Sequence, residues 1–461
     1  MNDLLLGYYG DDFTGSTDVM EALGLAGVPA VLFLHPPTPE EMARFPGRRA
    51  IGIAGVSRSL PTAGMEDELR PAFEALSRLA CPLVHYKTCS TFDSSPTVGS
   101  IGRAMELGRE VFGSPWIPLV VGAPRLKRYV AFANLFATVD GETYRIDRHP
   151  TMSRHPVTPM REGDLRLHLA EQCDLAVRSF DTRALGLERE ERQAMLERLL
   201  AGGADAVLFD TLQEQDLARI GRLIWENRTG GQTFLAGSSG MEYALCAWWR
   251  EAGLIAPPTT WTSPGEREQI VVISGSASPV TAAQIEHARA IGYCDLRLDA
   301  PALVDPETSD KIADGAVKAA VAAIHDGRSP LLYTAVGPDD PAIARTRERS
   351  AAHGDNARNL GQQQGRILRR ILEATNLRRV CVAGGDTAGY VSRELSIRAL
   401  EMIIPATPGS PLCRTHASEE RFDGLEICLK GGQVGKPDFF ETFRRGEPED
   451  GAVGVLKADA H

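Results

Sequence analysis

The sequence lacks the cysteine patterns, long apolar runs and leader features by which several protein classes are identified. Its eight cysteines include no CxxC pair, which argues against a zinc site or a disulfide framework and favours free thiols in a reducing compartment. No apolar run approaches the roughly 20 residues that span a membrane. The first residues show neither a basic segment nor a cleavage site. We therefore expect a cytoplasmic protein with no membrane partner.

An excess of positive charge is also missing. The chain has 50 Lys and Arg against 61 Asp and Glu, for a net charge of −11. A protein with this balance is not expected to bind nucleic acid through its overall field. Any site for an anionic ligand must therefore concentrate basic residues locally.

Two common nucleotide-binding patterns are absent as well. The P-loop pattern GxxxxGK[ST] does not occur, because Gly435-Lys436 is followed by Pro437. The pattern GxGxxG does not follow the first predicted strand, which disfavours an NAD-dependent dehydrogenase. Any phosphate binding must therefore use other loops.

What the chain does contain is a regular alternation of buried-strand and helix patterns. Predicted strands are residues 4–9, 30–34, 50–56, 83–89, 117–121, 206–210 and 233–236, then 269–273, 295–298, 331–335, 379–383 and 426–429. Helical periodicity between several of them is typical of βαβ units and mostly parallel sheets. Residues 130–139, followed by a turn at Asp140-Gly141, instead indicate a short antiparallel excursion.

A proline-rich segment at residues 255–268 is the best linker candidate in the chain. It separates a predicted domain of residues 1–254 from a second domain of residues 269–445, which is followed by a polar tail at 446–461. We therefore predict an α/β protein of two lobes. Each lobe is a mostly parallel sheet flanked by helices, with the active site in the cleft between the lobes.

The first predicted strand ends in Asp11-Asp12-Phe13-Thr14-Gly15-Ser16, where a helix begins. In an open α/β sheet this is the place where ligands bind. Adjacent carboxylates there are costly to leave unpaired, so they usually hold hydroxyls, a metal or a cation. The alternative is that Asp12 or Thr14 only caps the helix.

Other predicted strand ends of the first lobe add cations and hydroxyls. Arg58 and Lys87 each follow a strand and could hold a carboxylate, or could neutralise Asp11, Asp12 and Asp93 in a structural network. The segment 154–159 is a rigid turn or a lid that contributes polar groups. The predicted substrate-binding residues are Asp11, Arg58, Lys87, Ser90, Asp93, Ser94, His155 and Thr158.

Three glycine-rich loops follow strands in the second lobe. They are Ser274-Gly275-Ser276-Ala277-Ser278, Gly384-Gly385-Asp386-Thr387-Ala388-Gly389 and Lys430-Gly431-Gly432-Gln433-Val434-Gly435. Any one of them could be a tight connection, but three in one lobe indicate a nucleotide, because free N–H groups at helix N-termini bind phosphate. The predicted nucleotide-binding residues are Ser274, Ser276, Gly384, Gly385, Asp386, Thr387, Gly431 and Gly432.

Taken together and in order, these segments resemble the four-carbon acid sugar kinase family. The matching segments are DDFTGS (11–16), AGVSRS (54–59), YKTCSTFDSS (86–95), RHPVTPM (154–160), GSSG (237–240), SGSASPVTAAQI (274–285), GGDTAG (384–389) and LKGGQVGKPDFF (429–440). The resemblance implies an acid sugar on the first lobe and ATP on the second. YKTCSTFDSS and RHPVTPM are most similar to the 3-oxo-tetronate kinase branch.

The chain departs from that branch at residues 122–128, where GAPRLKR replaces the usual Asn-Gly-Arg turn, and at residues 430–435, where the glycines are kept. The first departure makes a branched substrate such as 3-oxo-isoapionate a candidate. Alternatives are a threonate or erythronate kinase, or a non-catalytic regulator that binds a sugar acid.

The resemblance suggests a mechanism in which ATP with Mg²⁺ phosphorylates a terminal hydroxyl. Asp12 would be the catalytic base, ahead of Asp93 and Asp11, while Arg58 and Lys87 would hold the substrate carboxylate or keto oxygen. No metal-ligand motif supports the magnesium ion, which follows from the chemistry alone. The oligomeric state, for which a homodimer is one option, stays open.

Overall fold

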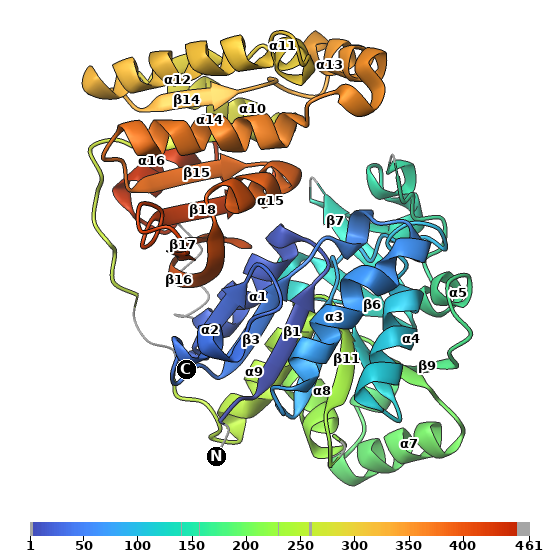
Figure 1. The fold of residues 1–461 in the computed structure, drawn as a ribbon. Coiled ribbons are helices and arrows are strands. Elements are labelled where there is room, and N and C mark those ends of the chain that lie inside the picture. Colours follow the sequence, from blue (N-terminus) through green and yellow to red (C-terminus); the bar gives the residue numbers. More distant parts are fainter. Residues whose placement is uncertain (1–2, 140, 156, 229, 258–260, 450–461) are drawn as a thin grey trace. The chain divides into compact units, whose positions relative to one another are not determined.

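The computed structural model describes residues 3–139, 141–155, 157–228, 230–257 and 261–449 (Figure 1). The chain separates into two compact units, residues 1–259 and 260–461. Residues 258–260 of the predicted linker and residues 450–461 of the predicted tail lie outside the described residues, as do Asp140 and Pro156. No helix within the described ranges is both long and apolar enough to cross a membrane.

The first unit has eleven strands and nine α-helices within the described residues. The strands are β1 (Leu6–Gly10), β2 (Ala30–Phe33), β3 (Ala50–Ala54), β4 (Leu83–Lys87), β5 (Ile117–Val120), β6 (Arg128–Ala131), β7 (Asn134–Val139), β8 (Glu142–Arg145), β9 (Val177–Phe180), β10 (Ala206–Phe209) and β11 (Thr233–Gly237). The helices are α1 (Phe13–Leu25), α2 (Pro39–Ala43), α3 (Met65–Ser77), α4 (Ile101–Phe112), α5 (Leu165–Ala170), α6 (Thr182–Leu185), α7 (Arg189–Ala201), α8 (Glu214–Glu226) and α9 (Gly240–Glu251).

Eight of these strands form a parallel sheet in the order β2-β3-β1-β4-β11-β5-β10-β9. Strands β1, β3 and β4 are buried along their whole length, which explains their continuous apolar sequences. Strands β2 and β3 lie on one side of β1, and β4 lies on the other. The order therefore reverses between β1 and β4, and such a switch point is where open α/β sheets bind ligands.

Local sequence explains where the helices of this unit begin and end. Helix α4, for example, begins after Ser100, whose hydroxyl accepts a hydrogen bond from the Arg103 N–H at 3.1 Å. It ends at Gly113, which has a φ of +59°. Helices α3 and α4 pack against each other, and α9 packs against both α1 and α8.

The predicted antiparallel excursion is present, but it has three strands, β6-β7-β8. The segment 130–139, predicted as one strand, is interrupted by a turn at Phe132 and Ala133, which have φ values of +49° and +65°. Neither residue is typical of such a turn, so the sequence does not signal it. The buried Asp210 carboxylate stabilises the turn by accepting hydrogen bonds from both N–H groups, at 2.7 and 3.0 Å.

The second unit has seven strands and seven α-helices within the described residues. The strands are β12 (Val271–Ser274), β13 (Cys294–Arg297), β14 (Pro330–Tyr333), β15 (Arg379–Ala383), β16 (Ile397–Thr407), β17 (Ser410–Ala417) and β18 (Glu426–Lys430). The helices are α10 (Pro279–Ala290), α11 (Ala300–Val304), α12 (Ser309–His325), α13 (Pro341–His353), α14 (Leu360–Ala374), α15 (Gly385–Glu394) and α16 (Phe439–Arg445).

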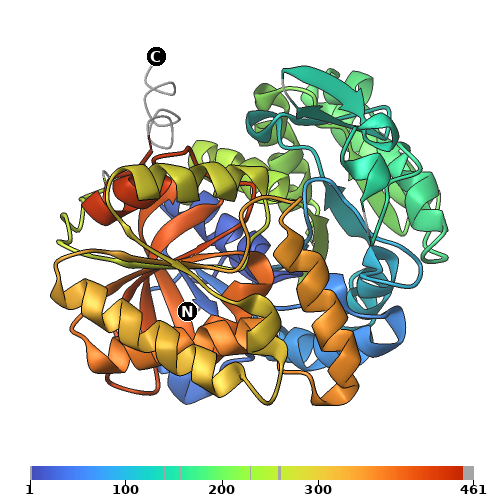
Figure 2. The same cartoon turned by 90° about the horizontal axis from the view of Figure 1, so that it is seen from above.

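Its strands follow the order β13-β14-β12-β15-β18-β17-β16. All run in the same direction except β17, which is antiparallel to both of its neighbours, β18 and β16. Figure 2 shows α10 and α16 on one face of this sheet and α12 and α14 on the other. The switch point lies between β12 and β15.

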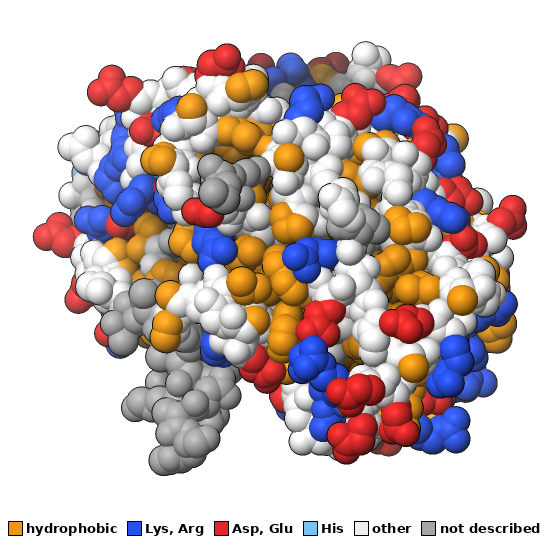
Figure 3. All heavy atoms as spheres, turned by 90° about the horizontal axis from the view of Figure 1, so that it is seen from below, with side chains coloured by type: hydrophobic (Ala, Val, Ile, Leu, Met, Phe, Trp, Pro, Cys, Tyr) orange, Lys and Arg blue, Asp and Glu red, His pale blue; other side chains and the backbone are white. Residues whose placement is uncertain are grey.

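Strands β9, β16 and β17 were not predicted. Strand β9 lies at the edge of its sheet, and only Phe180 in it is buried, so its apolar pattern is weak. In β16 and β17, Pro405 and Pro411 disfavour a strand prediction, because proline cannot donate to a ladder. Figure 3 shows one face of the molecule, on which basic and acidic side chains are interspersed rather than gathered by sign.

Candidate active site

The two adjacent carboxylates after β1 share one arginine. Arg58 lies in a 3₁₀ turn after β3 and contacts both oxygens of Asp11, at 2.8 and 3.1 Å. Its third nitrogen is 2.5 Å from the Asp12 carboxylate. The backbone brings them together, since the Arg58 N–H donates to the Asp11 carbonyl at 3.1 Å.

Asp12 also caps helix α1. One carboxylate oxygen accepts a hydrogen bond from the Gly15 N–H at 2.6 Å, and the other accepts one from the Thr14 hydroxyl at 3.2 Å. The capping alternative is therefore correct, and it coexists with the ion pair. The Asp12 side chain is 28% exposed and that of Asp11 only 5%, so Asp12 is the carboxylate that a ligand can reach.

The environment separates the two carboxylates electrostatically. Burial and the neighbouring Asp12 outweigh the charge of Arg58 and raise the pKa of Asp11 to about 6. Burial also disfavours the charge on Asp12, but Arg58, the Gly15 N–H and Lys87 outweigh it and lower the pKa of Asp12. Asp12 is thus a fully ionised hydrogen-bond acceptor at neutral pH.

Lys87 ends strand β4 and is buried beneath the start of α1. Its ammonium group is 3.1 Å from the carboxylate of Asp18, on the second turn of α1. The Asp11 N–H donates to the Lys87 carbonyl at 3.0 Å, so the ends of β1 and β4 are joined. Asp18 was not predicted as a site residue. It lies four residues after Thr14, about one helical turn, and this spacing is the signal that would have placed it near the strand end.

Asp93, Thr158 and His155, all predicted as substrate-binding residues, lie within hydrogen-bond distance of one another through Thr158. The Thr158 hydroxyl is 3.2 Å from the Asp93 carboxylate and 3.0 Å from Nδ1 of His155. The other Asp93 oxygen accepts a hydrogen bond from the Thr91 hydroxyl at 2.5 Å. The charge of Asp93 also acts on Arg58, so this group belongs to the same cluster as Asp11 and Asp12.

The two predicted serines of this loop differ. The Ser94 hydroxyl is buried and lies 2.9 Å from both His168 Nε2 and the Gln172 side-chain amide. His168 and Gln172 lie on or just after α5 and were not predicted. Ser90 is half-buried, and its hydroxyl has no hydrogen-bond partner within the described part of the chain. The geometry favours Ser90 as a ligand and Ser94 as an anchor of the loop.

In the second unit, the predicted loops after β12, β15 and β18 follow three neighbouring strands. The Gly275 N–H donates to the Ala383 carbonyl at 3.0 Å, and the Gly384 N–H donates to the Lys430 carbonyl at 2.9 Å. Gln364 on α14 braces the first two loops by donating to the Ser274 carbonyl at 2.9 Å and accepting from the Thr387 hydroxyl at 3.3 Å.

The loop after β18 is held from both sides. Thr281 and Gln284 on α10 donate to the carbonyls of Gly432 and Val434, at 2.9 and 3.0 Å. Lys430, which was not predicted, is buried and donates to the carbonyls of Gly431 and Val434, both at 2.9 Å. A Cβ atom on Gly432 would lie 2.5 Å from the Ser276 hydroxyl, so the loops approach more closely than any side chain at that position allows.

The first turn of α15 suits a phosphate group. Its N-cap residue is Gly384, with a φ of +123°, and no side chain of the described residues caps the helix. The N–H groups of its first turn therefore stay available to an anionic ligand, which the helix dipole also favours. Thr387 is buried there and Asp386 is exposed.

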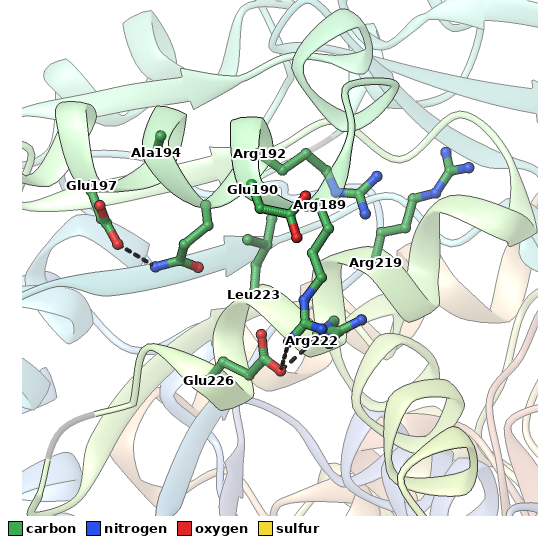
Figure 4. A pocket seen from close by; sticks show the side chains of 10 residues that line it. Arg189, Glu190, Arg192, Ala194, Glu197, Arg219, Arg222, Leu223 and Glu226 are labelled. Atoms are coloured by element: carbon green, nitrogen blue, oxygen red, sulfur yellow. Dashed lines mark hydrogen bonds and ion pairs between the residues drawn. The ribbon is translucent and has the colours of Figure 1, made fainter.

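Two surface pockets lie elsewhere and gather none of the predicted residues. The first, of about 390 Å³, lies between α7 and α8 (Figure 4). Its charges pair with one another, since Glu226 contacts Arg189 at 3.1 Å and Arg222 at 3.0 Å. The second, of about 520 Å³, is lined by residues of α10 and α16 and by the segments beside them.

Both units match known domain families. Residues 6–245 match a sugar-binding N-terminal domain, and residues 271–440 match a nucleotide-binding C-terminal domain. The sugar-binding model covers the Asp11, Arg58 and Lys87 cluster, and the nucleotide-binding model covers the three glycine-rich loops.

Full-length relatives share both domains. A protein of Paraburkholderia graminis named 3-oxo-isoapionate kinase is 49% identical over 96% of this chain and 94% of its own length. A 3-oxo-tetronate kinase of Pseudomonas savastanoi pv. phaseolicola is 29% identical over 95% of this chain and 96% of its own. A solved structure from Salmonella typhimurium LT2, described as a tRNA synthase, has the same fold, with a TM-score of 0.77 and 24% identity over 95% of this chain and 98% of its own.

Proposed function

The chain belongs to the four-carbon acid sugar kinase family, and on that premise we propose that its substrate is 3-oxo-isoapionate or a closely related branched 3-oxo acid. The observation that carries the proposal is the 49% identity to the Paraburkholderia graminis kinase of that name, against 29% to the 3-oxo-tetronate kinase of Pseudomonas savastanoi. That the enzyme is an ATP-dependent sugar-acid kinase is common to both relationships. Residues 122–128, which differ from the pattern of the 3-oxo-tetronate kinases, follow strand β5 of the same sheet as the carboxylate cluster. A sequence difference there is expected to change which acid is accepted.

Asp12 contacts the substrate hydroxyl that accepts the phosphoryl group. It is the exposed member of the carboxylate pair, and it stays ionised because its pKa is lowered. It therefore accepts a hydrogen bond from the terminal hydroxyl, orients it, and takes its proton as the new P–O bond forms. Phosphoryl transfer depends mostly on positioning and on charge stabilisation, so a weak base suffices.

ATP is bound mainly by backbone groups of the second unit. The free N–H groups at the start of α15 and the loops at Ser276 and Gly432 bind the phosphates of ATP. Mg²⁺ suits Asp386, because this ion is usually held by one or two carboxylates together with substrate phosphates. When bound, it would neutralise charge on the transferred group. Transfer requires the γ-phosphate to reach the hydroxyl at Asp12, and the active site in a cleft between the lobes stays a prediction.

The test is ADP release with Mg·ATP against a panel of acids: 3-oxo-isoapionate, 3-oxo-tetronates, threonate and erythronate. We expect the highest kcat/KM for the branched oxo acid. Preference for a 3-oxo-tetronate would move the enzyme to the other branch, and preference for threonate or erythronate would reject a 3-oxo substrate. Binding of an acid without turnover on any member of the panel would favour a regulator instead.

A further inference from the structure

The cations predicted to hold the substrate carboxylate are already engaged. Arg58 contacts Asp11 and Asp12, and Lys87 contacts Asp18. With Asp93, which also acts on Arg58, the cluster brings four carboxylates to two cations. A substrate carboxylate at Arg58 or Lys87 would therefore enter a region of net negative charge, which disfavours its binding.

Arg128, at the start of β6, differs from Arg58 and Lys87 in its hydrogen-bond partners, which are carbonyls rather than carboxylates. Its Nη1 donates to three carbonyls, those of Leu126 and Lys127 at 3.1 Å and that of Thr138 at 3.4 Å. Its Nε is buried and has no hydrogen-bond partner. Within the described residues no carboxylate pairs with it, and burial lowers its pKa. A buried guanidinium nitrogen without an acceptor is costly, and an anionic partner would offset this cost.

The backbone places Arg128 at the same sheet edge as the carboxylate cluster. It exchanges hydrogen bonds with Ala123, at 2.9 and 3.2 Å, just after the carboxyl end of β5. Strand β11 lies between β5 and β4, and at its end Ser238 N–H donates to Val120 while the Gly237 carbonyl accepts from Thr88. Cys89, two residues after Lys87, lies within electrostatic range of both Arg128 and Arg58.

We propose that Arg128 binds the carboxylate of the acid sugar, with its Nε and Nη2 groups as donors. This inference rests on the proposed function and specifies its substrate site. The substrate then lies with its carboxylate toward β6 and its terminal hydroxyl at Asp12, so that the two ends of the molecule contact charges of opposite sign. Arg58 is a positioning residue that orients Asp11 and Asp12 and does not hold the carboxylate.

The test compares Arg128→Gln and Arg128→Lys with the wild type, using the best acid of the panel and its methyl ester. Loss of a charged hydrogen-bonding partner is expected to raise KM for the acid about 10- to 100-fold in Arg128→Gln. KM for the ester and KM for Mg·ATP should change less than about threefold, and Arg128→Lys should recover part of the affinity. The matched control is Arg189→Gln on α7, outside the proposed acid-binding residues, whose side chain pairs with Glu226.

If Arg128 only holds the turn, its loss would raise KM for the acid and for the ester equally and would lower Tm. An equal rise in both KM values, or an unchanged KM for the acid, would overturn the proposal. Calorimetric binding of the acid without ATP is measured in parallel. A protein that binds the acid in an Arg128-dependent manner but transfers no phosphate rejects the kinase substrate assignment and keeps the carboxylate site. A protein that phosphorylates the acid equally well without Arg128 rejects the carboxylate site and keeps the kinase substrate assignment.

Discussion

The two sheet edges to which we assign ligands, one in each unit, lie at equivalent points of their folds but consist of different chemical groups. Both are at a switch point, between β1 and β4 in the first unit and between β12 and β15 in the second. The first edge consists of charged side chains, with four carboxylates and two cations that interact with one another. The second consists of glycines, hydroxyls and backbone N–H groups, with its one buried lysine directed at carbonyls.

We attribute the difference to the ligand proposed for each edge. A phosphate chain is the same in every ATP molecule, so backbone N–H groups at a helix N-terminus are sufficient to recognise it. An acid sugar must be distinguished from related acids, and this requires side-chain charges and hydroxyls at defined positions. We therefore expect the first edge to respond to changes of charge and the second to changes of backbone geometry.

The largest effect is expected from removing the charge of Asp12. Asn keeps the helix cap, since Asn and Asp are comparable N-caps, but it cannot accept a proton. Asp12→Asn should lower kcat by about 100-fold or more with little change in Tm or in KM for Mg·ATP. The control is Asp181→Asn, which alters a cap of the same kind on α6 and should leave kcat unchanged. Near-full turnover in Asp12→Asn would reject Asp12 as the base.

A smaller loss is expected from a single methyl group on the nucleotide edge. Gly384 has a φ of +123°, which an L side chain rarely adopts, so Gly384→Ala should displace the start of α15. We expect KM for Mg·ATP to rise about tenfold, in line with a cost of ~1–3 kcal/mol for such a backbone, while KM for the acid changes little. Gly315→Ala is the control, because it lies in α12 with open space around its Cβ position. Equal KM values in both variants would contradict a backbone-built site.

The Asp11 carboxyl makes stability depend on pH. Its pKa rises from 3.8 to about 6 on folding, so between these values the folded protein binds more protons than the unfolded chain, and stability falls as the pH rises. Relative to Asp11→Asn, the wild type should lose about 2.4 kcal/mol between pH 4 and pH 7. Thermal unfolding of both proteins across this range measures the difference. The exposed Asp67→Asn should follow the wild type, and parallel curves for Asp11→Asn and wild type would contradict the burial argument.

The smallest effects distinguish the two serines of the YKTCSTFDSS segment. Ser90→Ala should raise KM for the acid about fivefold, the value of one hydrogen bond, and leave Tm unchanged. Ser94→Ala should lower stability by ~1–3 kcal/mol, because His168 and Gln172 lose a buried partner, and leave KM unchanged. Kinetics and thermal unfolding of the same two proteins give both readouts, and the opposite pattern would exchange the assigned roles.

Much of this arrangement was predictable from local sequence because it depends on where strands end. The carboxyl ends of parallel strands share one edge, so Asp12, Arg58 and Lys87 could be expected to lie together, as could the three glycine-rich loops. Partners supplied by helices distant in sequence were not predictable. His168 is 74 residues from Ser94, and Gln364 is 90 residues from Ser274. Gln364 did leave a signal, as a polar residue on the apolar stripe of α14.

The Phe132–Ala133 turn gives the small sheet β6-β7-β8 a defined attachment to its unit. Asp210 accepts hydrogen bonds from that turn and from the Thr182 N–H, Val130 forms a bridge with Thr211, and the side chains of Val130, Leu135 and Ala137 are fully buried. Because its three strands are contiguous in sequence and form a sheet of their own, this segment can be exchanged as one module. Evolution or a protein engineer could exchange residues 122–164 to change which acid is accepted while the phosphate-transfer machinery of the chain remains as it is.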